Sequence, residues 1–180
     1  HSVVYGKRCI AAAIDLRTEV VVSGGIASDA GLSPQQCGLC VKALGETVTT
    51  ASLDCTVWEK ESRQRQPPVT DAVAVILEVL HGVFEKEEKK AEVMSMLGVL
   101  DVTVNSDLPA MRGLGSSASF SVAVSACLLA YFDILPSRNS TTLDSDDLAR
   151  INSTALTAER RLHGNPSGID NFVVTYGGFV

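Results

Sequence analysis

Residues 99–132 place the tightest limit on how this chain can fold. Residues 99–104 alternate in character and are rich in β-branched side chains, which predicts a strand. Residues 118–132 form the longest apolar run, which three serines interrupt, and they predict a buried helix that begins at Ser116 or Ser117. This run is shorter than the roughly 20 residues that a membrane span needs. A strand, a loop and a buried helix in succession predict a sheet packed against helices, in the α+β class.

Further helices and strands are expected on both sides of this unit. Apolar residues recur at helical spacing within residues 69–84, and Asp144 or Ser145 can cap another helix that ends at His163 and Gly164. Stretches rich in β-branched or small apolar residues predict short strands at residues 3–5, 9–14, 17–22, 172–176 and 179–180. Residues 35–66 show weak periodicity and give no assignment.

The length of 180 residues suits one domain with a sizeable core. The chain begins at His1 without a methionine and ends at Val180 within an apolar stretch. We therefore expect residues 1–180 to be a fragment of a longer protein, incomplete at the N-terminus.

The charge balance limits the classes of partner. There are 15 basic and 21 acidic residues, so the net charge is −6. A general nucleic-acid binder needs a basic face, and this balance argues against one. An anionic ligand would have to be held by local features such as a helix N-terminus, a metal ion or a few placed cations.

The five cysteines are odd in number and irregular in spacing, which argues against a disulfide framework. Cys37 and Cys40 form a C-x-x-C pair, but a zinc site would want a second pair or histidines at ligand spacing. Reduced thiols in a cytosolic protein are the favoured interpretation.

A glycine-rich loop at residues 109–118 joins the predicted strand to the apolar helix. Gly113 and Gly115 allow the backbone to approach a ligand closely, and the helix start offers free N–H groups to a phosphate. The hydroxyls of Ser116 and Ser117 can donate to phosphate or bind Mg²⁺. A structural turn capped by serine explains the local pattern equally well. The loop is not a P-loop, because no lysine follows its glycines. It matches the dinucleotide-binding fingerprint formally, but that motif requires a much shorter loop between the strand and the first glycine.

A second chemically suggestive segment covers residues 159–171. Glu159 lies at the edge of the apolar face of its helix, so its carboxylate can point inward and contribute to a Mg²⁺ site. Asp170 follows a stiff loop and can orient or deprotonate a substrate hydroxyl. The alternatives are a solvated helix residue for Glu159 and a turn residue for Asp170.

Three stretches together give a family resemblance. Residues 106–118 resemble the phosphate-binding loop of the GHMP small-molecule kinases, and residues 1–7 look like the end of that family's first motif. Residues 159–171 are similar to a run typical of the mevalonate kinases within this family. The resemblance implies the N-terminal domain of a GHMP kinase, with the ribosomal-protein-S5-domain-2-like fold, and ATP-dependent phosphorylation of mevalonate in isoprenoid and sterol synthesis.

The resemblance also implies roles for individual residues. Ser117 and Glu159 would hold Mg²⁺, Asp170 would be the base at the substrate hydroxyl, and His1 and Ser167 would lie on the substrate side. The ATP contacts would come from one set of loop residues: Ser106, Met111, Arg112, Gly113, Leu114, Gly115, Ser116 and Ser117. Arg112 stands where mevalonate kinases commonly have a small residue, and its role is open.

Two parts of the family pattern fall outside this chain. The lysine just upstream of His1 and the C-terminal domain are both missing, so we expect the fragment itself to be inactive. The resemblance further implies a cytoplasmic enzyme that is a homodimer at full length, without nucleic-acid or membrane partners. The alternatives are another GHMP kinase, acting on phosphomevalonate, homoserine or a sugar, and a non-catalytic ATP-binding relative.

Overall fold

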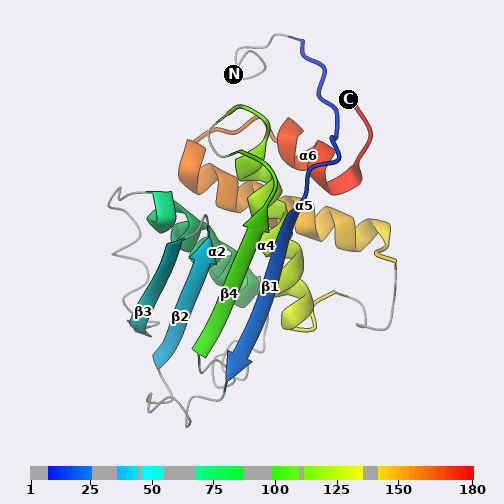
Figure 1. The fold of residues 1–180 in the computed structure, drawn as a ribbon. Coiled ribbons are helices and arrows are strands. Elements are labelled where there is room, and N and C mark those ends of the chain that lie inside the picture. Colours follow the sequence, from blue (N-terminus) through cyan, green and yellow to red (C-terminus); the bar gives the residue numbers. More distant parts are fainter. Residues whose placement is uncertain are drawn as a thin grey trace.

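A computed structural model describes residues 8–25, 36–43, 46–54, 68–86, 99–109, 112–135 and 142–180. Figure 1 shows the elements in chain order, which are β1 (Thr18–Gly25), β2 (Gln36–Ala43), β3 (Glu46–Asp54), α2 (Pro68–Lys86), β4 (Val99–Ser106), α4 (Ser116–Tyr131), α5 (Ser145–His163) and α6 (Ile169–Tyr176). The expectations for His1, Met111 and the strand at residues 3–5 lie outside the described residues.

The four strands form one mixed sheet in the order β1-β4-β2-β3. β1 and β4 are antiparallel, with Val20 opposite Val104, while β2 and β4 are parallel. β3 joins the sheet as an antiparallel neighbour of β2. The helices lie against this sheet, which confirms the predicted α+β class (Figure 1).

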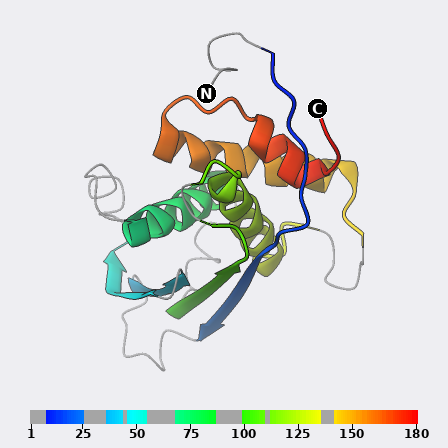
Figure 2. The same ribbon diagram turned by 45° about the horizontal axis from the view of Figure 1, so that its top comes forward.

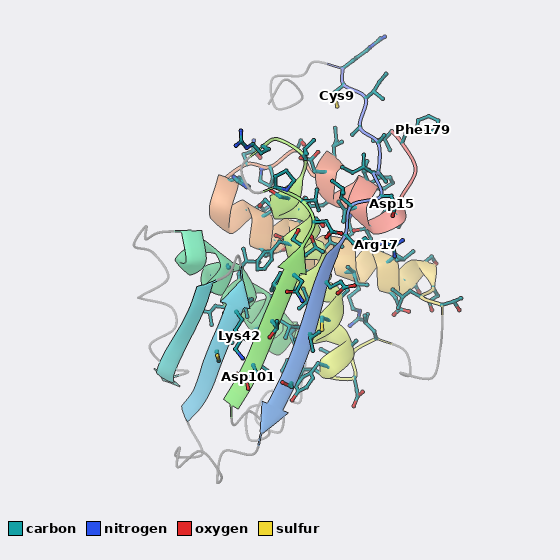
Figure 3. The ribbon with its side chains drawn as sticks, in the orientation of Figure 1. Cys9, Asp15, Arg17, Lys42, Asp101 and Phe179 are labelled. Carbon is teal, nitrogen blue, oxygen red and sulfur yellow. The ribbon has the colours of Figure 1, made fainter. Side chains whose placement is uncertain are left out.

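The helices that the structure describes lie on one side of the sheet, as Figure 2 shows from a second direction. α2 packs against β2, α4 packs against β1, and α5 crosses over both helices. The core between these layers takes buried side chains from β2, β4, α2, α4 and α5, such as Leu39, Val41, Ile76, Val79, Val102, Val124, Leu128 and Ile151, and the β1 valines Val20 and Val22 pack against it. None of the described helices covers the other face of the sheet: Val21 is 58% exposed, and Lys42 and Asp101 lie on that face in Figure 3.

Several sequence predictions are confirmed. The strand predicted at residues 99–104 is β4, and the strand predicted at 17–22 is β1, which continues through Gly25 instead of ending at Val22. The helix predicted at residues 69–84 is α2, and the apolar run is α4. Asp144 caps α5 and Gly164 ends it, as their residue types indicated.

The strand predicted at residues 172–176 is wrong, because this segment forms helix α6. Gly168 provides its N-cap at a φ of 77°, and Asn171 and Val173 are buried where α6 packs against α4 and α5. Phe172 and Tyr176 stack on the outer side, one helical turn apart, with ring centroids 4.5 Å apart. Packing of the buried face thus overrides the β preference of the valines and the threonine.

The predicted strand at residues 9–14 is also wrong. This segment makes a single antiparallel bridge between Ala12 and Phe179, which is all that remains of the predicted strand at 179–180. Phe179 is 80% exposed, so the bridge has no core beneath it. Figure 3 shows Cys9 and Phe179 at the same end of the molecule. Among the described residues, no helix is both long enough and apolar enough to cross a membrane.

Candidate active site

The glycine-rich loop leads into α4 through backbone that only glycine adopts readily. Gly113 and Gly115 both have a φ of 73°, in the left-handed region. A Cβ atom at either position would meet no heavy atom of the described residues within 4 Å. The space beside both glycines is therefore open to a ligand, and the predicted close approach of a phosphate to this backbone fits the structure.

The start of α4 leaves its own donors available. Its N-cap is Gly115, no side chain among the described residues caps it, and its first turn holds no acidic residue. The first N–H groups of a helix have no partner within the helix, and the helix dipole makes this end positive. An anion such as a phosphate would satisfy both features.

A buried carboxylate lies directly against this helix start. Ser117 Oγ donates to Glu159 Oε1 at 2.5 Å, and Ser121 Oγ, one turn further along α4, donates to the same oxygen at 3.2 Å. The Glu159 side chain is 7% exposed, so the inward direction predicted from its helix position is confirmed. Ser117 and Glu159 lie 42 positions apart in sequence and meet where α4 packs on α5.

His163 completes this cluster, and the sequence analysis missed it. Its Nε2 lies 3.2 Å from Ser117 Oγ and 4.0 Å from Glu159 Oε2, and its side chain is 53% exposed. The sequence contained one indication of this placement. His163 follows Glu159 by four residues on a helix, so the two side chains share a face.

The Ser117–Glu159 pair suits Mg²⁺ by its chemistry. Magnesium takes oxygen ligands and is usually bound by one or two carboxylates together with phosphate oxygens and water. Within the described residues, no group of three or more histidine, cysteine or acidic side chains could hold a metal ion without help. A hydroxyl and a carboxylate beside an open helix start therefore fit a cation that arrives with a phosphate.

Asp170 lies in the first turn of α6, and its side chain is exposed. It follows the loop after α5, as predicted, and it is the second residue of a helix, because α6 begins at Ile169. Ser167 lies in the loop before α6, and the Ser167 Oγ accepts a hydrogen bond from the Ile169 N–H at 3.4 Å. Figure 1 shows the loop at residues 164–168 at the same end of the molecule as the glycine-rich loop.

A chain of hydroxyls fixes both ends of the glycine-rich loop. Ser119, in the first turn of α4, donates to Thr18 Oγ1 at 2.8 Å, and Thr18 Oγ1 lies 2.8 Å from Ser106 Oγ. Ser106 Oγ also accepts the Leu108 N–H at 3.3 Å. Ser106, which is predicted to contact a nucleotide, thus also contacts Thr18 of β1. Nothing in the sequence indicated this contact.

The end of β4 is also tied to β1 through the backbone. The Asp107 N–H donates to the Arg17 carbonyl at 2.8 Å, where the chain enters β1. Figure 3 marks Asp15 and Arg17 at this point. Arg112 and Leu114, at the outer part of the loop, are exposed, so their side chains are accessible to a ligand.

Comparisons with known proteins agree with these features. The family model "GHMP kinases N terminal domain" matches residues 72–178. The human mevalonate kinase is 32% identical over 197 residues, with 99% of this chain and 49% of that protein covered. The mevalonate kinase of Arabidopsis thaliana is 30% identical over 198 residues, with 100% of this chain and 52% of that protein covered. The chain therefore spans about half the length of these curated relatives.

Solved structures support the fold. The Methanococcus jannaschii mevalonate kinase matches 99% of this chain and 47% of its own with a TM-score of 0.66 at 19% identity. The L. major mevalonate kinase, in complex with R-mevalonate, matches 94% of this chain and 40% of its own with a TM-score of 0.55 at 23% identity. The family model covers more than half of the chain and includes both α4 and Glu159, so the chain belongs to the GHMP kinases.

Proposed function

We propose that this chain is the nucleotide- and substrate-binding part of a mevalonate kinase. The whole protein would transfer the γ-phosphoryl group of ATP to the 5-hydroxyl of mevalonate, in the cytoplasm, as a step of isoprenoid and sterol synthesis. The observation that carries the proposal is the Ser117–Glu159 pair beneath the open start of α4. Relatives named mevalonate kinase that align along 99% or more of the chain support the choice of substrate.

The glycine-rich loop binds the phosphates of ATP in this proposal. Gly113 and Gly115 let the backbone come close, and the N–H groups at the start of α4 donate to phosphate oxygens. Met111, Arg112, Leu114 and Ser116 surround the phosphates, and Ser106 contacts the nucleotide. This arrangement stabilises the charge that develops on the transferred phosphoryl group, which is the main catalytic task in such reactions.

Ser117 and Glu159 are the proposed ligands of Mg²⁺. When bound, the cation would neutralise negative charge on the phosphates and help to orient them. Glu159 is already buried and held by hydroxyl hydrogen bonds, so little reorganisation of the protein would accompany binding.

Asp170 is the proposed base. Its carboxylate would orient the 5-hydroxyl of mevalonate and accept its proton as the oxygen attacks the γ-phosphorus and ADP leaves. The first turn of α6 favours a negatively charged side chain at this position. Ser167, and His1 outside the described residues, lie on the substrate side in this proposal.

Substitution of Asp170 tests the reaction in the full-length protein. Asp170→Asn should lower kcat by roughly 10²- to 10⁴-fold, because the amide cannot accept the proton. Asp146→Asn is the matched control, since Asp146 is also acidic and in the first turn of its helix, α5, and it should leave kcat unchanged. The measurement is the rate of ADP formation with mevalonate, ATP and Mg²⁺.

Other outcomes would replace the proposal. Phosphorylation of phosphomevalonate, homoserine or galactose, without phosphorylation of mevalonate, would identify another GHMP kinase. Tight Mg·ATP binding without turnover would identify a non-catalytic relative. A homodimer of the full-length protein, measured by light scattering, is part of the same proposal.

A further inference from the structure

Helix α4 contains three serines spaced four residues apart: Ser117, Ser121 and Ser125. Residues four apart lie on the same side of a helix. Ser117 is partly exposed at the helix start, whereas Ser121 and Ser125 are both 0% exposed. The three hydroxyls therefore form one row that leads from the ligand side into the protein interior.

The two buried hydroxyls have different surroundings. Ser121 Oγ donates to Glu159 Oε1 at 3.2 Å. Ser125 Oγ has no hydrogen-bond partner among the residues that the structure describes. Burying a hydroxyl without a partner has a cost, and burying a carboxylate without partners costs more. The Ser121 hydroxyl therefore stabilises the buried Glu159 carboxylate by supplying one of the hydrogen bonds that it needs in the protein interior.

Both hydroxyl contacts of Glu159 fall on one of its two oxygens. Oε1 accepts from Ser117 and Ser121, while Oε2 faces His163 Nε2 at 4.0 Å, beyond hydrogen-bond distance. Oε2 is thus the oxygen left for a cation. A metal ion bound by Ser117 would share that hydroxyl, and the bond from Ser121 would remain as the fixed support of Oε1.

We propose that Ser121 is a positioning residue that holds the Glu159 carboxylate with Oε2 directed to the metal ion. This proposal rests on the proposed function of Glu159 as a magnesium ligand. Ser121 is too deeply buried to touch a nucleotide or mevalonate, so it acts through Glu159. Partners of metal ligands of this kind commonly decide how well the ligand is oriented.

The test is Mn²⁺ binding to the full-length protein in the presence of saturating ADP, followed by electron paramagnetic resonance. Ser121→Ala should weaken Mn²⁺ binding by roughly 10- to 100-fold. Ser125→Ala removes an equally buried hydroxyl from the same helix and should leave Mn²⁺ affinity unchanged. Thermal unfolding of both variants without metal separates a loss of stability from a loss of cation affinity.

A variant of similar size keeps the test sharp if Ser121→Ala folds poorly. Ser121→Cys preserves the volume but is a weak donor, so it should also lower Mn²⁺ affinity. Equal affinities in the Ser121 and Ser125 variants would overturn the proposal. A wild-type protein that binds no Mn²⁺ with ADP would instead overturn the metal site itself, and the inference with it.

Discussion

Helices α4 and α5 begin in opposite ways. At α5, the Asp144 side chain accepts hydrogen bonds from the N–H groups of Asp146 and Asp147. The Asp147 side chain in turn accepts a hydrogen bond from the Asp144 N–H. At α4, the N-cap is a glycine, the first turn is uncharged, and among the described residues no side chain caps the helix. The first N–H groups of α5 thus bind side chains of the same helix end, whereas those of α4 bind no capping side chain among the described residues.

The difference separates stability from binding. A capping box stabilises a helix by satisfying donors that would otherwise need water. The open start of α4 forgoes this contribution, and the helix is held instead by its buried apolar residues. The same N–H groups then remain available to a phosphate. Substitutions at equivalent positions of the two helices should therefore affect different properties.

The largest effect is expected at Ser117. In the full-length protein, Ser117→Ala should reduce kcat/KM by about 100-fold, because it removes a proposed metal ligand and a partner of Glu159. Ser145→Ala removes a hydroxyl from the first turn of α5 and should leave kcat/KM unchanged. Steady-state kinetics at varied Mg²⁺ concentrations measure kcat/KM for both variants. Equal reductions of kcat/KM would contradict the proposed difference between the two helix starts.

An intermediate effect is expected from an added charge. Ser116→Asp places a carboxylate at the first helical position of α4, where the helix dipole favours it but a phosphate would be repelled. We expect ATP to bind roughly tenfold more weakly, with unchanged or raised thermal stability. Ser145→Asp adds the same charge at the first position of α5, and calorimetric ATP titration should detect no change. Unaltered ATP affinity in Ser116→Asp would mean that the phosphates lie elsewhere.

The smallest effect on function is expected at Asp144. Asp144→Ala should lower the melting temperature but not ATP affinity, whereas Asp144→Asn retains an acceptor and should lower it less. The N–H of Asp147 is the main cause that holds the pKa of Asp144 below its usual 3.8. The stabilising contribution of this charge is therefore present above pH 3.8 and is lost as the pH falls through the lower folded-state pKa. Melting curves from pH 7 to pH 2.5 should converge with those of Asp144→Ala at the acid end.

The elements with a strong local pattern could be predicted from sequence, and the others could not. β4, α2, α4 and the start of α5 each combine regular apolar spacing with a recognisable boundary residue. β2 and β3 escaped prediction because their polar and small residues, such as those of Glu46–Asp54, alternate weakly. α6 was mistaken for a strand because its local preference opposes the packing of Asn171 and Val173 against two other helices.

The site shows the same division. Gly113, Gly115, Ser117 and Glu159 could be identified as candidates because residue type and neighbours indicate a chemical role for each. Ser121 and Thr18 could not, since an isolated serine or threonine carries no such indication. Their importance depends on which distant side chain they meet, and the packing of α4 on α5 and β1 decides that.

The hydroxyl chain through Thr18 has a consequence for how the protein folds. Thr18 reaches Ser106 across 88 positions and Ser119 across 101 positions of sequence. Contacts between residues so far apart form slowly, because a long loop must first close. The glycine-rich loop therefore reaches its final shape only after β1 has paired with β4 and α4 has packed against it. The proposed phosphate site is then a property of the completed fold, and a partly folded chain would lack it.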